Sequence, residues 1–245
     1  MDYIKTWFSG IKEDFILNFV KEDRWKFITS GLKNTLVITF FAVILGIVLG
    51  VIIAVIRSSY DKTAPTMKKG FKKFVFGFFN AICNIYLTII RGTPVVVQLM
   101  IMYYIIFATS RNSLLVAILA FGINSGAYVA EIVRSGIMSV DAGQFEAGRS
   151  LGFNHMLTMW YIIIPQAFKN VLPALANEFI VLLKETSVAG YVTIRDLTMG
   201  GNIIRSNTYS AFMPLIAVAL IYLFMVMILT WLVGRLERRL RNDER

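Results

Sequence analysis

Five long stretches without a charged residue dominate this sequence of 245 residues. They cover residues 34–56, 74–90, 92–110, 112–130 and 206–234. The hydrocarbon core of a bilayer is about 30 Å thick, and about 20 apolar residues in a helix cross it. The apolar residues make up 57% of the chain, well above the share in a soluble domain. The sequence therefore predicts an all-α polytopic membrane protein, built as one domain of bundled helices.

Four spans are expected at about residues 32–56, 114–133, 167–187 and 212–233. Residues 74–107 are too long for one upright crossing, because a helix rises 1.5 Å per residue, and too short for two comfortable ones. Since Gly92, Thr93 and Pro94 interrupt this stretch, we predict one tilted, broken helix there, which gives five transmembrane helices. Within the first span, Gly46 and Gly50 have the spacing that lets two helices approach closely.

Positive charge indicates how the helices are oriented. Residues 57–73 contain six Lys or Arg residues and one acid, and residues 235–245 contain five Lys or Arg residues. Cytoplasmic loops carry an excess of Lys and Arg, so we expect the N-terminus outside and the C-terminus in the cytoplasm. Because the basic residues are placed in this way, we interpret the net charge of +10 as a sign of membrane orientation rather than of nucleic-acid binding.

The chain divides into three parts. Residues 1–29 alternate charges with aromatic side chains, as an amphipathic helix at the membrane surface does, although a frayed, solvated tail would have the same composition. Residues 30–240 form the transmembrane domain, and residues 241–245 a cytoplasmic tail. Inside the domain, residues 135–165 read as a polar, glycine-containing loop, and irregular polar backbone must lie in water or against protein.

The loop contains the most informative motif of the chain. Its residues Gly143, Gln144, Glu146, Ala147, Gly148, Arg149, Leu151 and Gly152 are followed by Ile164, Pro165, Gln166 and Ala167. A short helix that ends at Gly152, a turn and a second short helix would present Ala147 and Gly148 as small surfaces for close approach by a partner. A solvated loop without a partner is the alternative.

This motif resembles the "EAA" signature of permease subunits in binding-protein-dependent ABC importers. The segments around Arg91–Pro94, Glu131–Ile137, Pro173–Glu178 and Lys184–Ser187 are similar to the polar amino acid branch of that family. The signature departs at Gly148, where alanine is usual, and this weakens the local helix by up to about 1 kcal/mol.

The resemblance implies a type I ABC importer permease, with the MetI-like fold, in the bacterial cytoplasmic membrane. It implies as partners two copies of an ABC ATPase subunit, a second permease subunit in a homodimer or heterodimer, and an external amino-acid-binding protein. The loop would couple the permease to the ATPase. Membrane lipid surrounds the chain, and no nucleic acid is expected.

No phosphate-binding G-x-x-x-x-G-K-[ST] motif occurs in the sequence. We therefore expect that the chain is not an enzyme and binds no cofactor, and that ATP and Mg²⁺ bind to the partner ATPase. A single cysteine, Cys83, and a single histidine, His155, exclude Cys- or His-rich metal sites.

Polar residues inside apolar helices are candidates for the substrate pathway, because polar groups facing lipid are costly. Glu178 in the fourth span could bind the ammonium group of an amino acid or a basic side chain, or it could instead form an internal ion pair or be a protonated buried acid. Asn124 could line a cavity or bond between helices, and the break at Arg91 could hold a zwitterion with free backbone groups or be a plain proline kink. The full set of candidates is Arg91, Thr93, Gln98, Asn124, Glu178, Lys184, Glu185, Thr186 and Ser187.

Glu131 and Arg134 are three residues apart on one helix, and we expect a structural ion pair between them. Two other classes of function stay open at this point. A proton-coupled secondary amino acid transporter would use Glu178 and Glu131 as proton carriers, and a membrane scaffold would carry no solute.

Overall fold

The computed structural model describes residues 10–64, 67–68 and 70–242. Every regular element in these residues is a helix, which confirms the predicted all-α class. The α-helices are α2 (Trp25–Thr63), α3 (Phe71–Gly92), α4 (Val95–Ile101), α5 (Ser113–Met138), α6 (Ala142–Ser150), α7 (His155–Thr158), α8 (Ile164–Glu185), α9 (Leu197–Thr208) and α10 (Phe212–Asn242). The chain also has wider π-helical turns at Ile16–Val20, Met102–Ile106 and Met159–Ile163. Tighter 3₁₀ turns lie at Lys21–Asp23 and Thr186–Val192.

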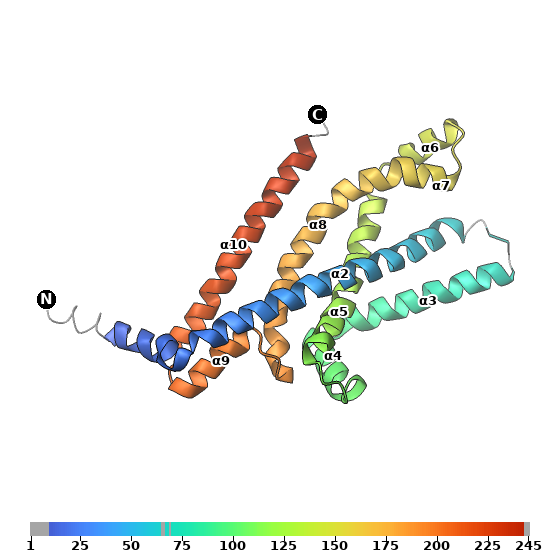
Figure 1. Ribbon diagram of the computed structural model, residues 1–245. Coiled ribbons are helices and arrows are strands. Elements are labelled where there is room, and N and C mark those ends of the chain that lie inside the picture. Colours follow the sequence, from blue (N-terminus) through green and yellow to red (C-terminus); the bar gives the residue numbers. More distant parts are fainter. Residues whose placement is uncertain (1–9, 65–66, 69, 243–245) are drawn as a thin grey trace.

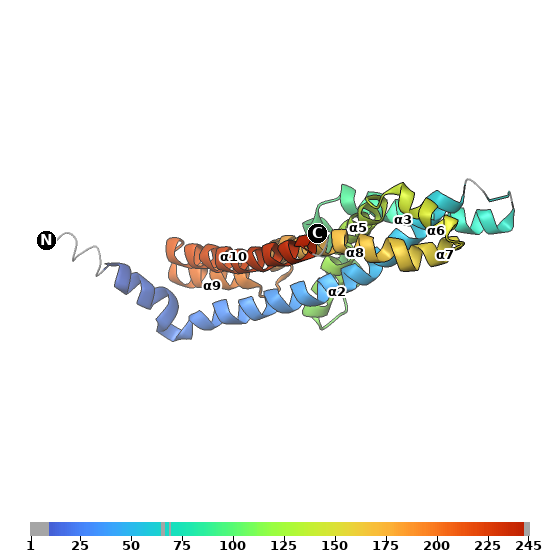
Figure 2. The same cartoon turned by 90° about the horizontal axis from the view of Figure 1, so that it is seen from above.

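The long helices run between two ends of an elongated molecule (Figure 1). One end holds α9 and the beginning of α2, and the other holds α6, α7, the end of α2 and the beginning of α3. Seen from above, α9 lies between α10 and the first half of α2, and α8 lies beside α5 (Figure 2).

Within the described residues, α2, α3, α5 and α10 are long and apolar enough to cross a membrane. The predicted fourth span corresponds to α8, which has 22 residues but is more polar because it contains Lys169, Glu178, Lys184 and Glu185. Of these residues Glu178 is buried against protein, and α8 is a fifth long helix by length and packing rather than by composition.

The predicted break in the second span is confirmed at Thr93 and Pro94. Helix α3 ends at Gly92, Thr93 has extended backbone angles of φ −123° and ψ 146°, and α4 begins at Val95. Proline disfavours helical geometry in the residue before it, which explains the position of the break. One premise of the prediction was wrong, because α3 begins at Phe71, and its 22 residues are by themselves long enough to cross.

Helices α2 and α5 pack together along most of their length, and glycine permits the contact. A Cβ atom on Gly46 would lie 2.9 Å from Ser125 Oγ, and one on Gly50 would lie 2.5 Å from Val129 Cγ1. Both distances are shorter than van der Waals contact, so only glycine fits at these positions. The close helix approach predicted for Gly46 and Gly50 is confirmed.

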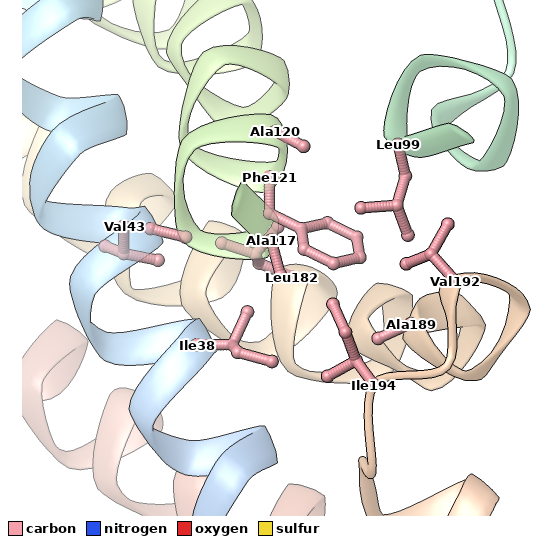
Figure 3. Packing of buried hydrophobic residues seen from close by; sticks show 11 residues of the cluster. Ile38, Val43, Leu99, Ala117, Ala120, Phe121, Leu182, Ala189, Val192 and Ile194 are labelled. Atoms are coloured by element: carbon pink, nitrogen blue, oxygen red, sulfur yellow. The ribbon is translucent and has the colours of Figure 1, made fainter. Parts of the chain in front are cut away.

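A buried apolar cluster joins five segments near the middle of the molecule (Figure 3). Phe121 of α5 is fully buried and lies between side chains of α2, α4, α8 and the 3₁₀ turn after α8. The labelled members of the cluster are Ile38, Val43, Leu99, Ala117, Ala120, Phe121, Leu182, Ala189, Val192 and Ile194. The cluster fixes α4 against α5 and α8, and thereby holds the break at Thr93 in place.

The N-terminal segment was predicted to extend to residue 29, but α2 already begins at Trp25. Glu22 and Asp23 adopt left-handed backbone angles, each with φ 56°, and this turn separates the N-terminal helix from α2. The buried side chain of Asn18 accepts a hydrogen bond from Thr208 Oγ1 and donates one to Ser210 Oγ, which ties the segment to the end of α9. Residues 1–9 of the predicted amphipathic segment lie outside the described residues, as do residues 243–245 of the tail.

Candidate functional site

The predicted loop forms a helical hairpin, made of α6, a turn and the continuous helix of α7 and Met159–Ile163. Asp141 caps the start of α6, since its Oδ1 accepts a hydrogen bond of 2.7 Å from Gly143 N. Gly152 ends the helix with φ +82°, and Phe153 N and Gly152 N donate to the carbonyls of Gly148 and Arg149. This pairing is the Schellman motif, which favours glycine at the left-handed position. The predicted short helix ending at Gly152 is confirmed.

Gly148 has a different role from the one predicted. It is buried inside the hairpin, and a Cβ atom there would lie 2.6 Å from Thr158 Cγ2 and 3.1 Å from Ile162 Cδ1. Its small size therefore serves the packing of α6 against α7 and the following turn. The prediction that Gly148 faces a partner is wrong, whereas Ala147 is exposed as expected.

The outer surface of the hairpin is exposed and partly apolar. Glu146, Ala147 and Arg149 are accessible on α6. Around them, large apolar side chains are more than half exposed: Leu151 by 73%, Met156 by 64%, Trp160 by 62% and Tyr161 by 71%. An apolar patch of this kind at the end of a bundle is typical of a protein-binding surface.

The hairpin is attached firmly to two long helices. Buried apolar side chains of Ile137, Val140, Ile163 and Ala167 join it to the end of α5 and the beginning of α8. Gln166 Nε2 of α8 donates to Gln144 Oε1 of α6 at 3.3 Å, and Asn170 Nδ2 donates to Ser139 Oγ at 2.9 Å. A displacement of α6 would therefore move α5 and α8.

Glu178 lies on α8 at 8% exposure, and its carboxylate accepts a hydrogen bond of 2.9 Å from Ser125 Oγ on α5. No basic side chain of the described residues forms an ion pair with it. The interpretation of Glu178 as part of an internal ion pair is therefore wrong for the described residues, whereas its interpretations as an ammonium-binding carboxylate and as a protonated buried acid stay predictions. The carboxylate sits where α2, α5 and α8 meet, because Ser125 also contacts Gly46.

The break between α3 and α4 is closed by side chains. Gln98 Nε2 donates to the carbonyls of Ile90 and Thr93 at 2.7 and 3.0 Å, and Thr93 Oγ1 donates to Ile89 O. The expectation that the break leaves these carbonyls free is wrong, because Gln98 is placed one turn later and folds back over them. Gln98 Oε1 in turn accepts a hydrogen bond of 2.9 Å from Asn124 Nδ2, which brings three of the predicted residues together.

The predicted ion pair between Glu131 and Arg134 is wrong. Glu131 Oε1 lies 2.9 Å from Arg57 Nη1 and 3.6 Å from Arg91 Nη1. Arg134 Nη2 lies 3.0 Å from Asp61 Oδ2. Glu131 thus pairs with basic side chains of α2 and α3, and Arg134 with an acidic side chain of α2, because both helices pack closely against α5. These ion pairs link neighbouring helices instead of stabilising α5 alone.

The remaining candidates, Lys184, Glu185, Thr186 and Ser187, lie at the end of α8 and in the turn that follows. Thr186 is fully buried, and its hydroxyl donates to Leu183 O, so it points into the protein core. Lys184 is exposed. Ser187 lines a pocket of about 300 Å³ with Gly190, Tyr191, Thr198, Met199 and Asn202. Glu185 is close enough to Glu178 for the two carboxyl groups to interact electrostatically. The role of the four residues in the pathway stays a prediction.

The sequence reasoning did not identify Ser125, Arg57 or Asp61, which bind the predicted residues directly. Ser125 follows Asn124 in a run of small and polar residues, and this was a usable signal. The α2 partners gave none, because their contacts span more than seventy positions. Among the described residues, no group of three or more His, Cys, Asp or Glu side chains could hold a metal ion.

Comparison with known proteins gives three consistent similarities. The model of the family described as "Binding-protein-dependent transport system inner membrane component" matches residues 72–242. The chain is 35% identical over 217 residues to the putative glutamine transport system permease protein GlnP of Rickettsia typhi (strain ATCC VR-144 / Wilmington), covering 87% of this chain and 93% of that protein. It is 34% identical over 221 residues to the arginine transport system permease protein ArtQ of Bacillus subtilis (strain 168), covering 89% and 94%.

A solved structure supports the same assignment of fold. It is described as the crystal structure of an amino acid ABC transporter with histidines, and it superposes on this chain with a TM-score of 0.76. The sequence identity is 41%, and the match covers 87% of this chain and 94% of that one.

Proposed function

This chain belongs to the family of inner membrane components of binding-protein-dependent transport systems, and from this membership we propose that it is the permease subunit of an ABC importer for polar amino acids. Its relatives are described as permeases for glutamine and arginine, and its structural neighbour as an amino acid transporter with histidines. The amino acid crosses a multi-pass membrane domain by alternating access.

The observation that carries the proposal is the hairpin of α6 and α7, which is exposed outside and rigidly packed inside. Its outer side, with Ala147, Leu151 and Trp160, offers a partly apolar surface for an ATPase subunit. Its inner side is fixed to α5 and α8 through the cluster around Ile137 and Ile163. Closure of the two ATPase subunits around ATP and Mg²⁺ moves the hairpin, and α5 and α8 move with it.

The same two helices hold the candidate binding groups. Ser125 and Glu178 bind each other across α5 and α8, so a relative movement of these helices changes the environment of the carboxylate. Glu178 is suited to bind the α-ammonium group that all amino acids share. A basic side chain of the substrate could bind there too, which is consistent with relatives for glutamine as well as arginine.

We assign the hairpin and the C-terminus to the cytoplasm, and the N-terminus to the outside, by the distribution of Lys and Arg. The external amino-acid-binding protein then meets the end that holds α9. A second permease subunit completes the transporter with two-fold symmetry, since two-fold pairing is the commonest symmetry of oligomers built from like subunits.

Uptake by reconstituted vesicles tests this function. The chain is co-purified with its ATPase and binding protein, and uptake of radiolabelled L-glutamine, L-arginine and L-histidine is measured with ion gradients collapsed. We expect uptake of at least one of them to depend on ATP. Uptake that is independent of ATP but lost with the proton gradient would contradict the proposal and favour a secondary transporter that uses Glu178 and Glu131.

A further inference from the structure

Helix α3 has three distinct faces. Cys83 and Leu87 are buried, and a second face carries Phe78, Ile82, Ile85 and Ile89, which are 46–58% exposed. The third face is polar and consists of Asn80, Asn84, Thr88 and Arg91, here called the polar stripe. Its members are four, four and three residues apart, a spacing that places them one above another on a helix.

A polar stripe inside a membrane helix needs a polar environment. Asn80 Oδ1 is buried and has no hydrogen-bond partner within the described residues. Polar groups at this depth usually face a water-filled path or another protein group, because contact with lipid is costly. The apolar face around Ile85 and Ile89 is the side of α3 that suits lipid, and the polar stripe lies on a different side, next to the buried face.

Three members of the polar stripe, Asn84, Thr88 and Arg91, line a pocket of about 370 Å³ between α2, α3 and α5. The pocket is lined by Arg57, Asn84, Leu87, Thr88, Arg91, Gly92 and Glu131. Its volume falls in the range of about 300–1,000 Å³ that is usual for small-molecule sites. Most of its lining residues are polar, in contrast to the apolar exposed face of the same helix.

The charges in this pocket do not balance. Arg57 and Arg91 both approach one oxygen of Glu131, at 2.9 and 3.6 Å, so two cations share a single carboxylate. Arg57 holds it closely, whereas Arg91 is further away and its side chain is 47% exposed. Arg91 is therefore able to bind a second carboxylate without leaving Glu131 unpaired.

We propose that the polar stripe of α3 lines the route by which the amino acid leaves Glu178 toward the cytoplasm, and that Arg91 binds its α-carboxylate in the pocket with Arg57 and Glu131. This inference rests on the proposed function. It adds a binding step in which the carboxylate is held by Arg91, while Asn84 and Thr88 replace part of the water around the substrate. The guanidinium group suits this role because it binds carboxylates through paired N–H groups.

Cysteine accessibility tests the water-filled route without relying on transport. Cys83 is the single cysteine of the sequence and is buried, so Cys83→Ala gives a cysteine-free background. Single cysteines are introduced as Asn84→Cys and Thr88→Cys on the polar stripe, and as Ile85→Cys and Ile89→Cys on the apolar face as controls. A charged, membrane-impermeant thiol reagent is added to the cytoplasmic face of vesicles that contain the assembled complex.

We expect the thiol reagent to label the cysteines at positions 84 and 88 and not to label those at positions 85 and 89. Equal labelling on both faces, or none at 84 and 88, would overturn the proposed route. This result is independent of whether the complex transports an amino acid, so it separates the inference from the proposed function.

Uptake of the three radiolabelled amino acids tests the role of Arg91. In a complex that transports at least one of them, Arg91→Gln is expected to lower uptake about tenfold or more, since a hydrogen bond to a charged group is lost. Arg91→Lys keeps the charge and should retain more uptake, and Ile89→Leu is the matched control on the apolar face. Arg57 continues to hold Glu131 in all three variants, so the helices stay joined.

Normal uptake by Arg91→Gln would overturn the carboxylate site. If that variant instead loses co-purified anionic lipid while its uptake is unchanged, the pocket is a lipid headgroup site, which also overturns the proposal. Failure of the unaltered complex to transport any of the three amino acids would count against the proposed function and not against the accessible route.

Discussion

Glu178 shows how a single residue joins structure and function in this chain. A carboxylate at 8% exposure requires hydrogen bonds, because an unsatisfied charged group in a protein interior is strongly unfavourable. Ser125 supplies one such bond across the helix interface at 2.9 Å. The pair is therefore a structural contact in the resting chain, and its rearrangement is available for binding a substrate ammonium group.

Ser125→Ala removes this hydrogen bond and leaves the buried carboxylate short of a donor. We expect the variant to be less stable by about 1–3 kcal/mol, the usual cost of an unsatisfied buried polar group. The melting temperature of the purified protein should fall, and Ser206→Ala at an exposed position of α9 serves as the control. An unchanged melting temperature would show that water replaces the hydroxyl and that the pair is not structural.

Gly148 gives a second test at a single position. Gly148→Ala adds a methyl group 2.6 Å from Thr158 Cγ2, and overpacking of this kind costs about 1–3 kcal/mol. The melting temperature should fall in Gly148→Ala and recover in part when Thr158→Ala is combined with it. Without recovery in the double variant, the two residues are not the cause of the strain.

Individual helices are explained by a few local rules together with packing. The contact between α2 and α5 depends on Gly46 and Gly50, and the contact between α6 and the next turn depends on Gly148. Pro94 breaks the second span, and Gly152 ends α6. Each of these positions lacks either a side chain or a backbone N–H, and the helix geometry follows from that.

Gly50→Ala is expected to push α2 away from α5. Its added Cβ would lie 2.5 Å from Val129 Cγ1 and 2.8 Å from the Ala130 backbone, which cannot easily move. A loss of about 1–3 kcal/mol follows from overpacking, and it should appear as a lower melting temperature. Gly234→Ala in α10 is the matched control and should not be destabilising, because an added Cβ there would have no neighbouring atom of the described residues within 4 Å.

These elements differ in how far the sequence predicts them. The spacing of Gly46 and Gly50, the break before Pro94 and the helix end at Gly152 depend on neighbouring residues, and all three were predictable. The α2 partners of Glu131 and Arg134 were not predictable, because they lie more than seventy positions earlier and their contacts depend on how the helices pack. The role of Gly148 was missed for the same reason, since Thr158 contacts it only once the hairpin has folded.

At the scale of the whole molecule, one mechanical unit connects the hairpin to the polar interior. The exposed surface of α6 and α7 lies at one end, and buried contacts extend from it through α5 and α8 to Ser125 and Glu178. Helices α2 and α3 add the polar pocket beside α5. The central claim is that an ATPase bound to the hairpin drives the movement of these helices.

Solute-stimulated ATP hydrolysis by the assembled complex tests this claim most directly. Ala147→Arg places a bulky charge on the exposed surface of α6 without touching its buried side, and Glu237→Arg at an exposed position of α10, on neither the hairpin nor α9, is the control. We expect Ala147→Arg to keep the melting temperature of the permease and to lose the stimulation of ATP hydrolysis by amino acid and binding protein, while Glu237→Arg retains it. Full stimulation in Ala147→Arg would contradict the coupling role of the hairpin.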